Sequence, residues 1–189
     1  KEAVQYKNLP VEIAADLYLN LSNMHVRMKD LTSAEQNLKK AKKLIPEVED
    51  KWEKMALKDF ANEITGDIFY LKQEFEKSIV FFKSSLQLSM EYYETDYHRE
   101  IGKIRIKLGN AYIKNEDFEN GFQQLQKAIT SVIPEFKPQS YLSNPQKESL
   151  YAENIIFEAL TAKAQALVLI SQKKSENLHL RKALECYQY

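Results

Sequence analysis

The sequence has 189 residues, and its 27 Lys and Arg balance its 27 Asp and Glu, which leaves no net charge. That balance argues against a protein that coats nucleic acid, because such binding depends on excess basic residues that displace counterions. Only 4 Gly and 5 Pro are present, too few turn formers for an all-β sandwich. The single cysteine, Cys186, excludes an internal disulfide and a multi-cysteine zinc site. No run of about 18 apolar residues is found, so we expect no membrane-spanning segment.

The elements expected along the chain are all helices. Residues that favour helix starts occur at 30–32 (Asp-Leu-Thr) and 115–117 (Asn-Glu-Asp), and Pro46 and Pro134 mark helix ends. The sequence starts at Lys1 rather than Met, so we expect a fragment of a longer protein. The expected helices cover about 11–28, 32–45, 47–72, 75–95, 97–114, 117–133, 147–171 and 177–188.

A spaced pattern of large and small residues recurs through the chain. It runs large-x2-Leu-small-x2-large-x8-small-x3-large-x2-small-x4-Pro, and it resembles the tetratricopeptide repeat. Small residues at the two inner places let paired helices cross at short range, and the large residues fill the surrounding grooves. The first copy is Tyr18, Leu21, Ser22, His25, Ala34, Leu38, Ala41 and Pro46. Later copies centre on Gly66 and Ser78, on Gly109 and Gly121, and partially on Ala164 and Ala183.

This resemblance implies an all-α fold, a right-handed superhelical solenoid of about four extended helix-turn-helix repeats in a single domain, 1–189. Ser22, Gly66 and Gly109 are 44 and 43 residues apart, against 34 in the ordinary repeat. We expect the extra residues, at 47–58 and 93–101, to lengthen helices by two or three turns. Trp52, Met55 and Leu57 would then pack against the end of a neighbouring helix. The expected repeats are about 11–46, 47–95, 97–134 and 147–189.

The one clear break is the proline-rich segment 134–146. It is either an ordinary surface loop or an ordered loop packed across the groove, with Phe136 and Tyr141 as anchors. From this loop onward the sequence also resembles the end of the repeat array in bacterial CHAT-domain proteins, where such an array precedes a caspase-like peptidase domain. That resemblance implies the non-catalytic recognition part of a larger protein. The matching residues are Asn144, Pro145, Glu153, Asn154, Glu158, Ala159, Leu160, Lys163, Ala164, Ala166, Leu167, Ala183, Leu184, Cys186 and Tyr187.

No constellation for catalysis is apparent in these residues. Cys186 follows the small residue of a helix crossing, so we expect a buried hydrophobic thiol. His25 takes an aromatic place of the repeat, whereas His98 and His179 suggest surface or turn positions, and their spacing fits no zinc site. There is no phosphate-binding glycine loop. We therefore expect no catalytic residue, no metal and no cofactor, and any peptidase domain would lie outside the chain.

The better candidate for function is the concave groove. In such arrays the first helix of each helix pair lines this groove. Residues at i, i+4, i+7 and i+11 share one helix face. Lys and Asn there can hold carboxylates and peptide backbone, and Asn23, Lys103 and Lys107 match places of a known carboxylate clamp. Leu19 and Ile64 depart from that clamp. The groove candidates are Asn20, Asn23, Arg27, Phe60, Ile64, Asp67, Lys103, Lys107, Asn110 and Lys114, and the stripe of the last first helix is Glu158, Ala162, Gln165 and Leu169.

The sequence thus favours a cytoplasmic protein-interaction scaffold that binds a protein or peptide segment. The alternatives are a nucleic-acid-binding helical-repeat regulator and a purely structural spacer. A nucleic-acid binder needs a basic groove with stacking aromatic residues, which the mixed stripes do not supply. The basic stretch at 39–43 lies on a second helix, which faces outward, so we expect a solvated face there.

Overall fold

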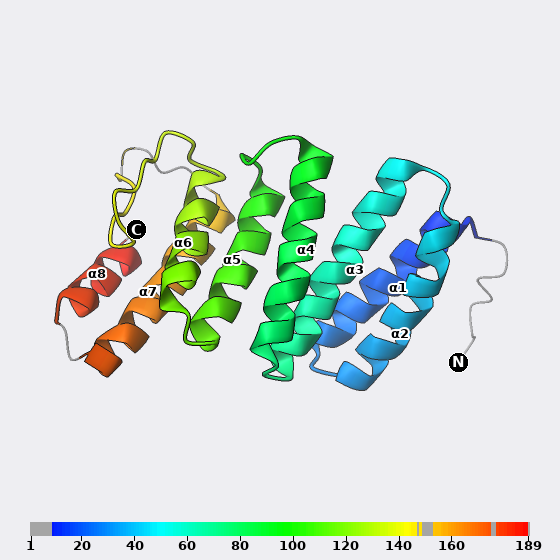
Figure 1. Cartoon of the computed structure of the whole chain (residues 1–189), viewed down its shortest axis with the longest axis horizontal. Helices are drawn as coiled ribbons and strands as arrows, with labels where there is room; N and C mark the ends of the chain where they lie inside the picture. Colours follow the sequence, from blue (N-terminus) through cyan, green and yellow to red (C-terminus); the bar gives the residue numbers. More distant parts are fainter. Residues whose placement is uncertain (1–8, 147, 149–152, 175–176, 189) are drawn as a thin grey trace. The chain divides into compact units, whose positions relative to one another are not determined.

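The protein consists of helices joined by short turns and one long loop (Figure 1). The computed structural model describes residues 9–146, 148, 153–174 and 177–188. Two compact units divide the chain, Lys1–Tyr92 and Tyr93–Tyr189. The eight expected helices are confirmed: α1 (Val11–Arg27), α2 (Leu31–Leu44), α3 (Lys51–Leu71), α4 (Phe75–Tyr93), α5 (Arg99–Lys114), α6 (Phe118–Thr130), α7 (Asn154–Lys174) and α8 (Asn177–Tyr187). A 3-10 turn, η1 (Ile45–Glu47), follows α2.

Side-chain caps set the starts of several helices. The Asp30 carboxylate accepts from the Ser33 N–H at the start of α2, and Asp117 accepts from the Asn120 N–H at the start of α6. Each carboxylate satisfies a backbone donor that has no partner within the helix. Asp50 caps α3 in the same way. The capping segments at 30–32 and 115–117 were therefore read correctly from the sequence.

Three turns within helix pairs share one unusual backbone conformation. Lys29, Gln73 and Glu116 have positive φ angles of 60°, 62° and 63°. In each turn the N–H of this residue bonds to the carbonyl three residues before it, and the next N–H bonds to the carbonyl five residues before it. These bonds close the exposed carbonyl end of the first helix. The same turn therefore recurs in the first three helix pairs.

The small residues lie where paired helices cross, as the repeat pattern predicts. The Ser22 hydroxyl donates to the Ala34 carbonyl across 2.8 Å, and the Ser78 hydroxyl donates to the Gly66 carbonyl across 2.9 Å. In the third pair a Cβ on Gly109 would lie 3.1 Å from the Gly121 carbonyl oxygen. The helices of that pair therefore approach too closely for a larger side chain at Gly109.

The extra residues of the long repeats are helical only in part. The first set forms η1, a short break and the first turns of α3, where the half-exposed Trp52 meets Tyr92 edge-on at 6.1 Å. The second set extends helices only at its ends, because Tyr93 ends α4 and α5 begins at Arg99, while residues 94–98 form a loop. Glu94 adopts φ 51° there, and the buried Arg105 holds the loop through an ion pair with Asp96 at 3.0 Å. The expected lengthening by two or three turns at 93–101 was therefore too large.

The seventh helix differs from expectation at both ends and in its composition. It begins at Asn154 and ends at Lys174, and the expected first residues 147 and 149–152 lie outside the described residues. By length and mean hydropathy (1.3), Asn154–Lys173 is apolar enough to cross a membrane, which the sequence analysis did not anticipate. Within the protein, 61% of that stretch is buried. It is the central helix of the second unit, and its side chains contribute to a core shared with α5, α6 and α8.

Candidate peptide-binding surface

A row of lysines runs along the side of α5 that the core does not cover. Lys103, Lys107 and Asn110 are half-buried and Lys114 is exposed, whereas the residues between them, such as Leu108 and Gly109, are buried. Lys103 pairs with Glu100 on its own helix at 3.4 Å. Helical spacing puts the four side chains on one face. The expected arrangement of these four residues on a single helix face is present.

The first helix of the next pair, α7, packs directly on α5. On α7 the Glu158 and Gln165 side chains are exposed, and Leu169 is 37% exposed. Ala162, the remaining member of this stripe, is buried at 6% exposure. Two neighbouring helices of the second unit thus carry a basic row and a mixed row with an apolar end. We call Lys103, Lys107, Asn110, Lys114, Glu158, Gln165 and Leu169 the α5–α7 surface.

The candidates in the first unit are less uniform. On α1, Asn20 and Arg27 are exposed and Asn23 is half-buried. The Asn20 amide already donates to the Asp16 carboxylate at 2.9 Å. These residues remain accessible to a partner, but the bond to Asp16 occupies one of the donors that peptide backbone would use.

On α3 one candidate is excluded by burial. Ile64 is only 1% exposed, because α3 packs against both α1 and α2, so Ile64 belongs to the core rather than to a binding surface. Phe60 packs partly on the same core, and Asp67 is half-buried. Leu19 is fully buried as well. The two departures from the carboxylate clamp are therefore core residues, which leaves no room for the clamp's polar side chains there.

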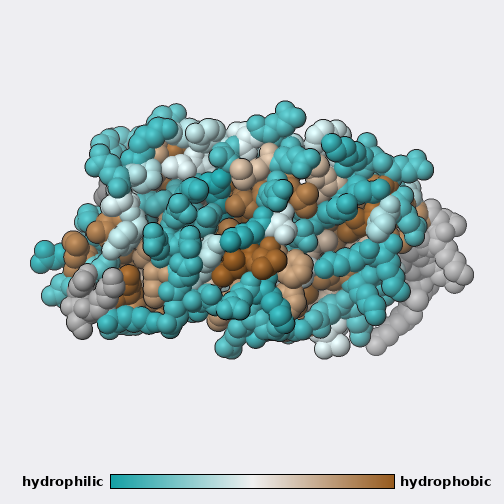
Figure 2. Space-filling model, in the orientation of Figure 1, coloured by the Kyte–Doolittle hydropathy of each residue, from teal (hydrophilic) through white to brown (hydrophobic). Residues whose placement is uncertain are grey.

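The basic stretch at 39–43 is mostly a solvated face, with one exception. Hydrophilic side chains cover most of the face shown in Figure 2, α2 included. Lys39, Lys40, Lys42 and Lys43 are all exposed. Lys42 differs in that its ammonium donates to the buried Thr65 hydroxyl at 2.8 Å and lies 5.5 Å from the Phe81 ring centroid. Burial lowers the pKa of Lys42. Its ammonium is engaged in packing α2 on the next helix pair and is not positioned to bind an external anion.

The proline-rich loop is ordered, and Phe136 and Tyr141 are its anchors, as in the second of the two alternatives. Phe136 packs on the core of the second unit. Tyr141 stacks on Phe122 with ring centroids 4.8 Å apart, and its hydroxyl bonds to His179 at 2.8 Å. Gln126 donates through Nε2 to the Ser140 and Ser143 carbonyls at 2.8 and 2.9 Å. The loop is therefore fixed to α6 and α8 by both rings and hydrogen bonds.

A buried lysine holds the other end of this loop. The Lys163 side chain on α7 is fully buried, and its ammonium donates to the Ser143 carbonyl and to Asn144 Oδ1 at 2.7 Å. Cys186 on α8 reaches the same amide oxygen at 3.4 Å. Burial lowers the pKa of Lys163 to about 8 and raises the pKa of the Cys186 thiol. The thiol is thus a buried and weakly ionised group, as expected.

One histidine and the buried lysine correct the sequence analysis, whereas His98 lies in the turn before α5, as expected. His179 is 2% exposed and supports the loop, so its expected surface position was wrong. His98 caps α5 by accepting from the Glu100 N–H at 3.3 Å and stacks on Tyr93. The role of Lys163 was not foreseen, although a lysine inside the apolar run 159–167 was a visible signal. No group of three or more His, Cys, Asp or Glu side chains that suits a metal occurs among the described residues.

Comparison with known proteins identifies the repeat. Residues 15–48 and 102–131 match the tetratricopeptide repeat family model. The chain therefore contains tetratricopeptide repeats in these two segments, and its helices pack in pairs of the same kind. Among solved structures, it is similar to the N-terminal domain of stress-induced protein-1 (STI-1) from C. elegans, with a TM-score of 0.50 and 18% identity over 66% of this chain and 89% of that domain. At this identity the likeness concerns the fold alone. No curated protein matches the chain.

The two matched segments correspond to the first and third repeats of the sequence pattern. Tetratricopeptide repeat domains generally bind proteins or peptide segments, and they are typically non-catalytic. Their first helices carry the contacts by virtue of position rather than of one invariant residue set, because sites vary freely on one backbone. The residues that distinguish this array are therefore those of its own first helices.

Proposed function

We propose that this array binds an acidic segment of a partner protein on the α5–α7 surface. The observation that supports the proposal is the row of Lys103, Lys107 and Lys114 on α5, together with the exposed Leu169 on the neighbouring helix α7. Ammonium groups attract carboxylates, the Asn110 amide can both donate to and accept from peptide backbone, and Leu169 offers an apolar contact. In the first unit, the α1 residues Asn20, Asn23 and Arg27 remain candidate contacts in their own right.

The test is a comparison of two charge-reversal pairs. An array of immobilised peptides that vary in acidic and apolar content is probed with the wild-type chain, with Lys103→Glu/Lys107→Glu, and with Lys39→Glu/Lys43→Glu as the control. Lys39 and Lys43 are exposed lysines on α2, and they avoid Lys42, which packs on Thr65. We expect the first pair to abolish binding of acidic peptides and the control pair to leave it intact. Binding should weaken with salt, since exposed charges are screened over about 10 Å at 0.1 M.

Two outcomes would overturn this proposal. If the Lys39/Lys43 pair removes binding and the Lys103/Lys107 pair does not, the outer face carries the interaction. If single-stranded RNA or DNA binds better than any acidic peptide and depends on the same lysines, the array is a nucleic-acid binder. Circular dichroism of both variants separates either result from loss of folding.

We also propose, from the second resemblance, that the array is the recognition part of a larger CHAT-type protein with a caspase-like peptidase domain. The support is that three of the resembling residues form one connected cluster, with Asn144 bound by Lys163 and Cys186. The test is the sequence of the parent gene product. A caspase-like domain with a His-Gly motif and a later catalytic cysteine would support the proposal, and a parent without such a domain would overturn it.

A further inference from the structure

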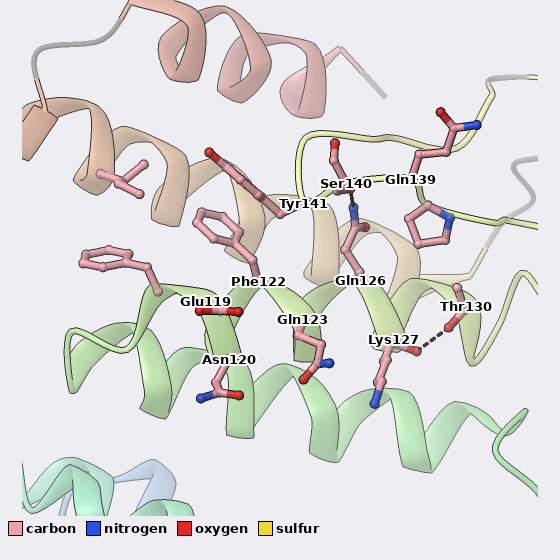
Figure 3. A pocket seen from close by; sticks show the side chains of 13 residues that line it. Glu119, Asn120, Phe122, Gln123, Gln126, Lys127, Thr130, Gln139, Ser140 and Tyr141 are labelled. Carbon is pink, nitrogen blue, oxygen red and sulfur yellow. Dashed lines mark hydrogen bonds between the residues drawn. The ribbon is translucent and has the colours of Figure 1, made fainter.

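The second unit contains a cavity of about 880 Å³ between α6 and the ordered loop. Figure 3 shows Phe122 and Gln126 of α6 pointing toward the loop, where Ser140 and Tyr141 lie. Gln123 and Lys127 also line the cavity, on the side of α6 away from the loop in this view. Its volume is in the range of ligand pockets, which are commonly 300–1,000 Å³.

Both walls of this cavity are fixed before any ligand arrives. The loop wall is held by the Gln126 bonds to Ser140 and Ser143, by the Tyr141–Phe122 stack and by the Tyr141–His179 bond. The other wall is the regular helix α6. A preformed site spends little binding free energy on ordering its own side chains. The fixed walls therefore keep the cavity open in the unbound protein, which suits it to binding a ligand.

The lining changes in chemistry along α6. Aromatic rings gather at one end, where Phe118, Phe122 and Tyr141 lie with Ile170. Exposed amides of Gln123 and Gln139 follow. Lys127 and Thr130 lie at the far end. Between Phe118 and Thr130, α6 runs for about 18 Å at 1.5 Å per residue, which equals about five residues of extended chain at about 3.3 Å each.

One buried polar atom beside the cavity lacks a hydrogen-bond partner in the part of the chain that the structure describes. Gln126 is 6% exposed, and although its Nε2 is fully used by the two loop carbonyls, its Oε1 has no hydrogen-bond partner among the described residues. A buried acceptor without a partner costs free energy that a ligand N–H would recover. Peptide backbone supplies N–H donors at regular intervals, and the neighbouring Gln123 amide can both donate and accept.

The charges in the cavity favour an acidic rather than a polyanionic ligand. Glu119 lies near the aromatic end and repels carboxylates there, whereas the exposed Lys127 attracts one at the far end. Lys127 forms no ion pair within the residues that the structure describes. One lysine and one glutamate give no basic excess of the kind that nucleic-acid binding needs.

We propose that this cavity is a second binding site, for an extended peptide segment with an aromatic side chain at the Phe118–Tyr141 end and a carboxylate at the Lys127 end. The aromatic side chain packs against the exposed part of Tyr141 and against Phe118, because Phe122 is only 3% exposed and its ring is already stacked on Tyr141. The backbone bonds to the exposed Gln123 and Gln139 amides. This site lies on α6 and the loop, so it is independent of the α5–α7 surface.

The experiment uses short labelled peptides and nuclear magnetic resonance of the whole chain. The probe peptides carry one Phe and one Asp separated by three Gly or Ser residues, in both orders, and control peptides lack either the Phe or the Asp. We expect chemical shift changes at the Gln123, Gln126 and Gln139 side-chain amides with the full probe only. Lys127→Glu and Gln123→Trp, both at exposed positions, should each weaken binding by at least about tenfold.

Variants elsewhere separate this site from the first one. Lys103→Glu/Lys107→Glu should leave binding of the Phe–Asp probe unchanged, and Lys127→Glu should leave binding to the α5–α7 surface unchanged. The proposal is overturned if no probe shifts the α6 and loop amides, or if Lys127→Glu and Gln123→Trp bind as the wild type does. It is also overturned if single-stranded RNA, rather than peptide, shifts these resonances.

Discussion

Lys163 Nζ donates to Asn144 Oδ1 across 2.7 Å, and no carboxylate takes part in the bond. Among the described residues, the hydrogen bonds of this fully buried ammonium thus go to amide and carbonyl oxygens of the loop. Neutral oxygens compensate only part of the free energy of removing a charge from water. The fixed position of the loop therefore depends on a residue that the fold holds at a cost.

The stability of the chain should rise with pH because of Lys163. Its pKa is lowered to about 8 in the folded state, against 10.5 for an ordinary lysine, so between these values the unfolded chain binds more protons. The contribution grows from pH of about 8 and levels off near 10.5, reaching up to about 3 kcal/mol at 1.36 kcal/mol per pKa unit. The measurement is urea unfolding across this range for the wild type and Lys163→Met.

Both proteins should carry Cys186→Ser, because the charge on Lys163 lowers the pKa of the Cys186 thiol, and removing the lysine would change that pKa as well. Burial also raises the pKa of Tyr70, which lowers stability as pH rises, but Tyr70 is common to both proteins. The difference between the two unfolding curves then isolates Lys163. A difference that stays constant between pH 8 and 10.5 would show that the lysine is not desolvated.

The Cys186 thiol should react slowly while the chain is folded. Thiolate is the reactive form, and burial of this thiol raises its pKa. We expect alkylation by iodoacetamide at pH 8 to be at least about tenfold slower than in urea. Cys186→Ser keeps a donor to Asn144 and should preserve peptide binding and the absence of hydrolytic activity. Cysteine-dependent hydrolysis by these residues alone would contradict the assignment of a structural thiol.

A side chain at Gly109 should destabilise the third helix pair. A Cβ there meets the Leu125 side chain at 3.0 Å and the Gly121 carbonyl oxygen at 3.1 Å, and the carbonyl cannot rotate away. We expect Gly109→Leu to cost on the order of 1–3 kcal/mol or more of unfolding free energy. Gln87→Leu, at an exposed position of α4, is the control. Equal melting temperatures of the two variants would place the helix crossing elsewhere.

Glycine should be favoured at the turn residues with positive φ. An L side chain in the left-handed region costs about 1–2 kcal/mol, and glycine avoids that cost while losing more backbone entropy on folding. Gln73→Gly, at φ 62°, should therefore raise the unfolding free energy by roughly 0.5–1 kcal/mol. The opposite effect, a loss of about 1 kcal/mol, is expected for Gln87→Gly within α4. Thermal unfolding of both variants compares the two signs directly.

The repeat pattern predicted the helix pairs because their crossings demand small residues at fixed spacing, and Ser22 and Gly66 lie at those crossings. It predicted less about turns, since Lys29, Gln73 and Glu116 adopt a conformation that glycine usually marks. Helical periodicity correctly predicted that the four α5 residues share one face. It wrongly predicted a surface position for Ile64, because α3 packs against helices on two sides and Ile64 is buried. The α6 cavity could not be foreseen, as it needs a loop folded back on its own helix.

Each half of the chain contains its own buried cluster. One joins α1, α2 and α3, and the other joins α5, α6, α7 and α8. In repeat arrays stability is close to a sum of local terms, so heating need not melt the halves together. A form with one half folded and the other unfolded then becomes populated between two transitions. Such a chain has two melting temperatures rather than one. A mutation in one core would shift only the transition of the half that contains it.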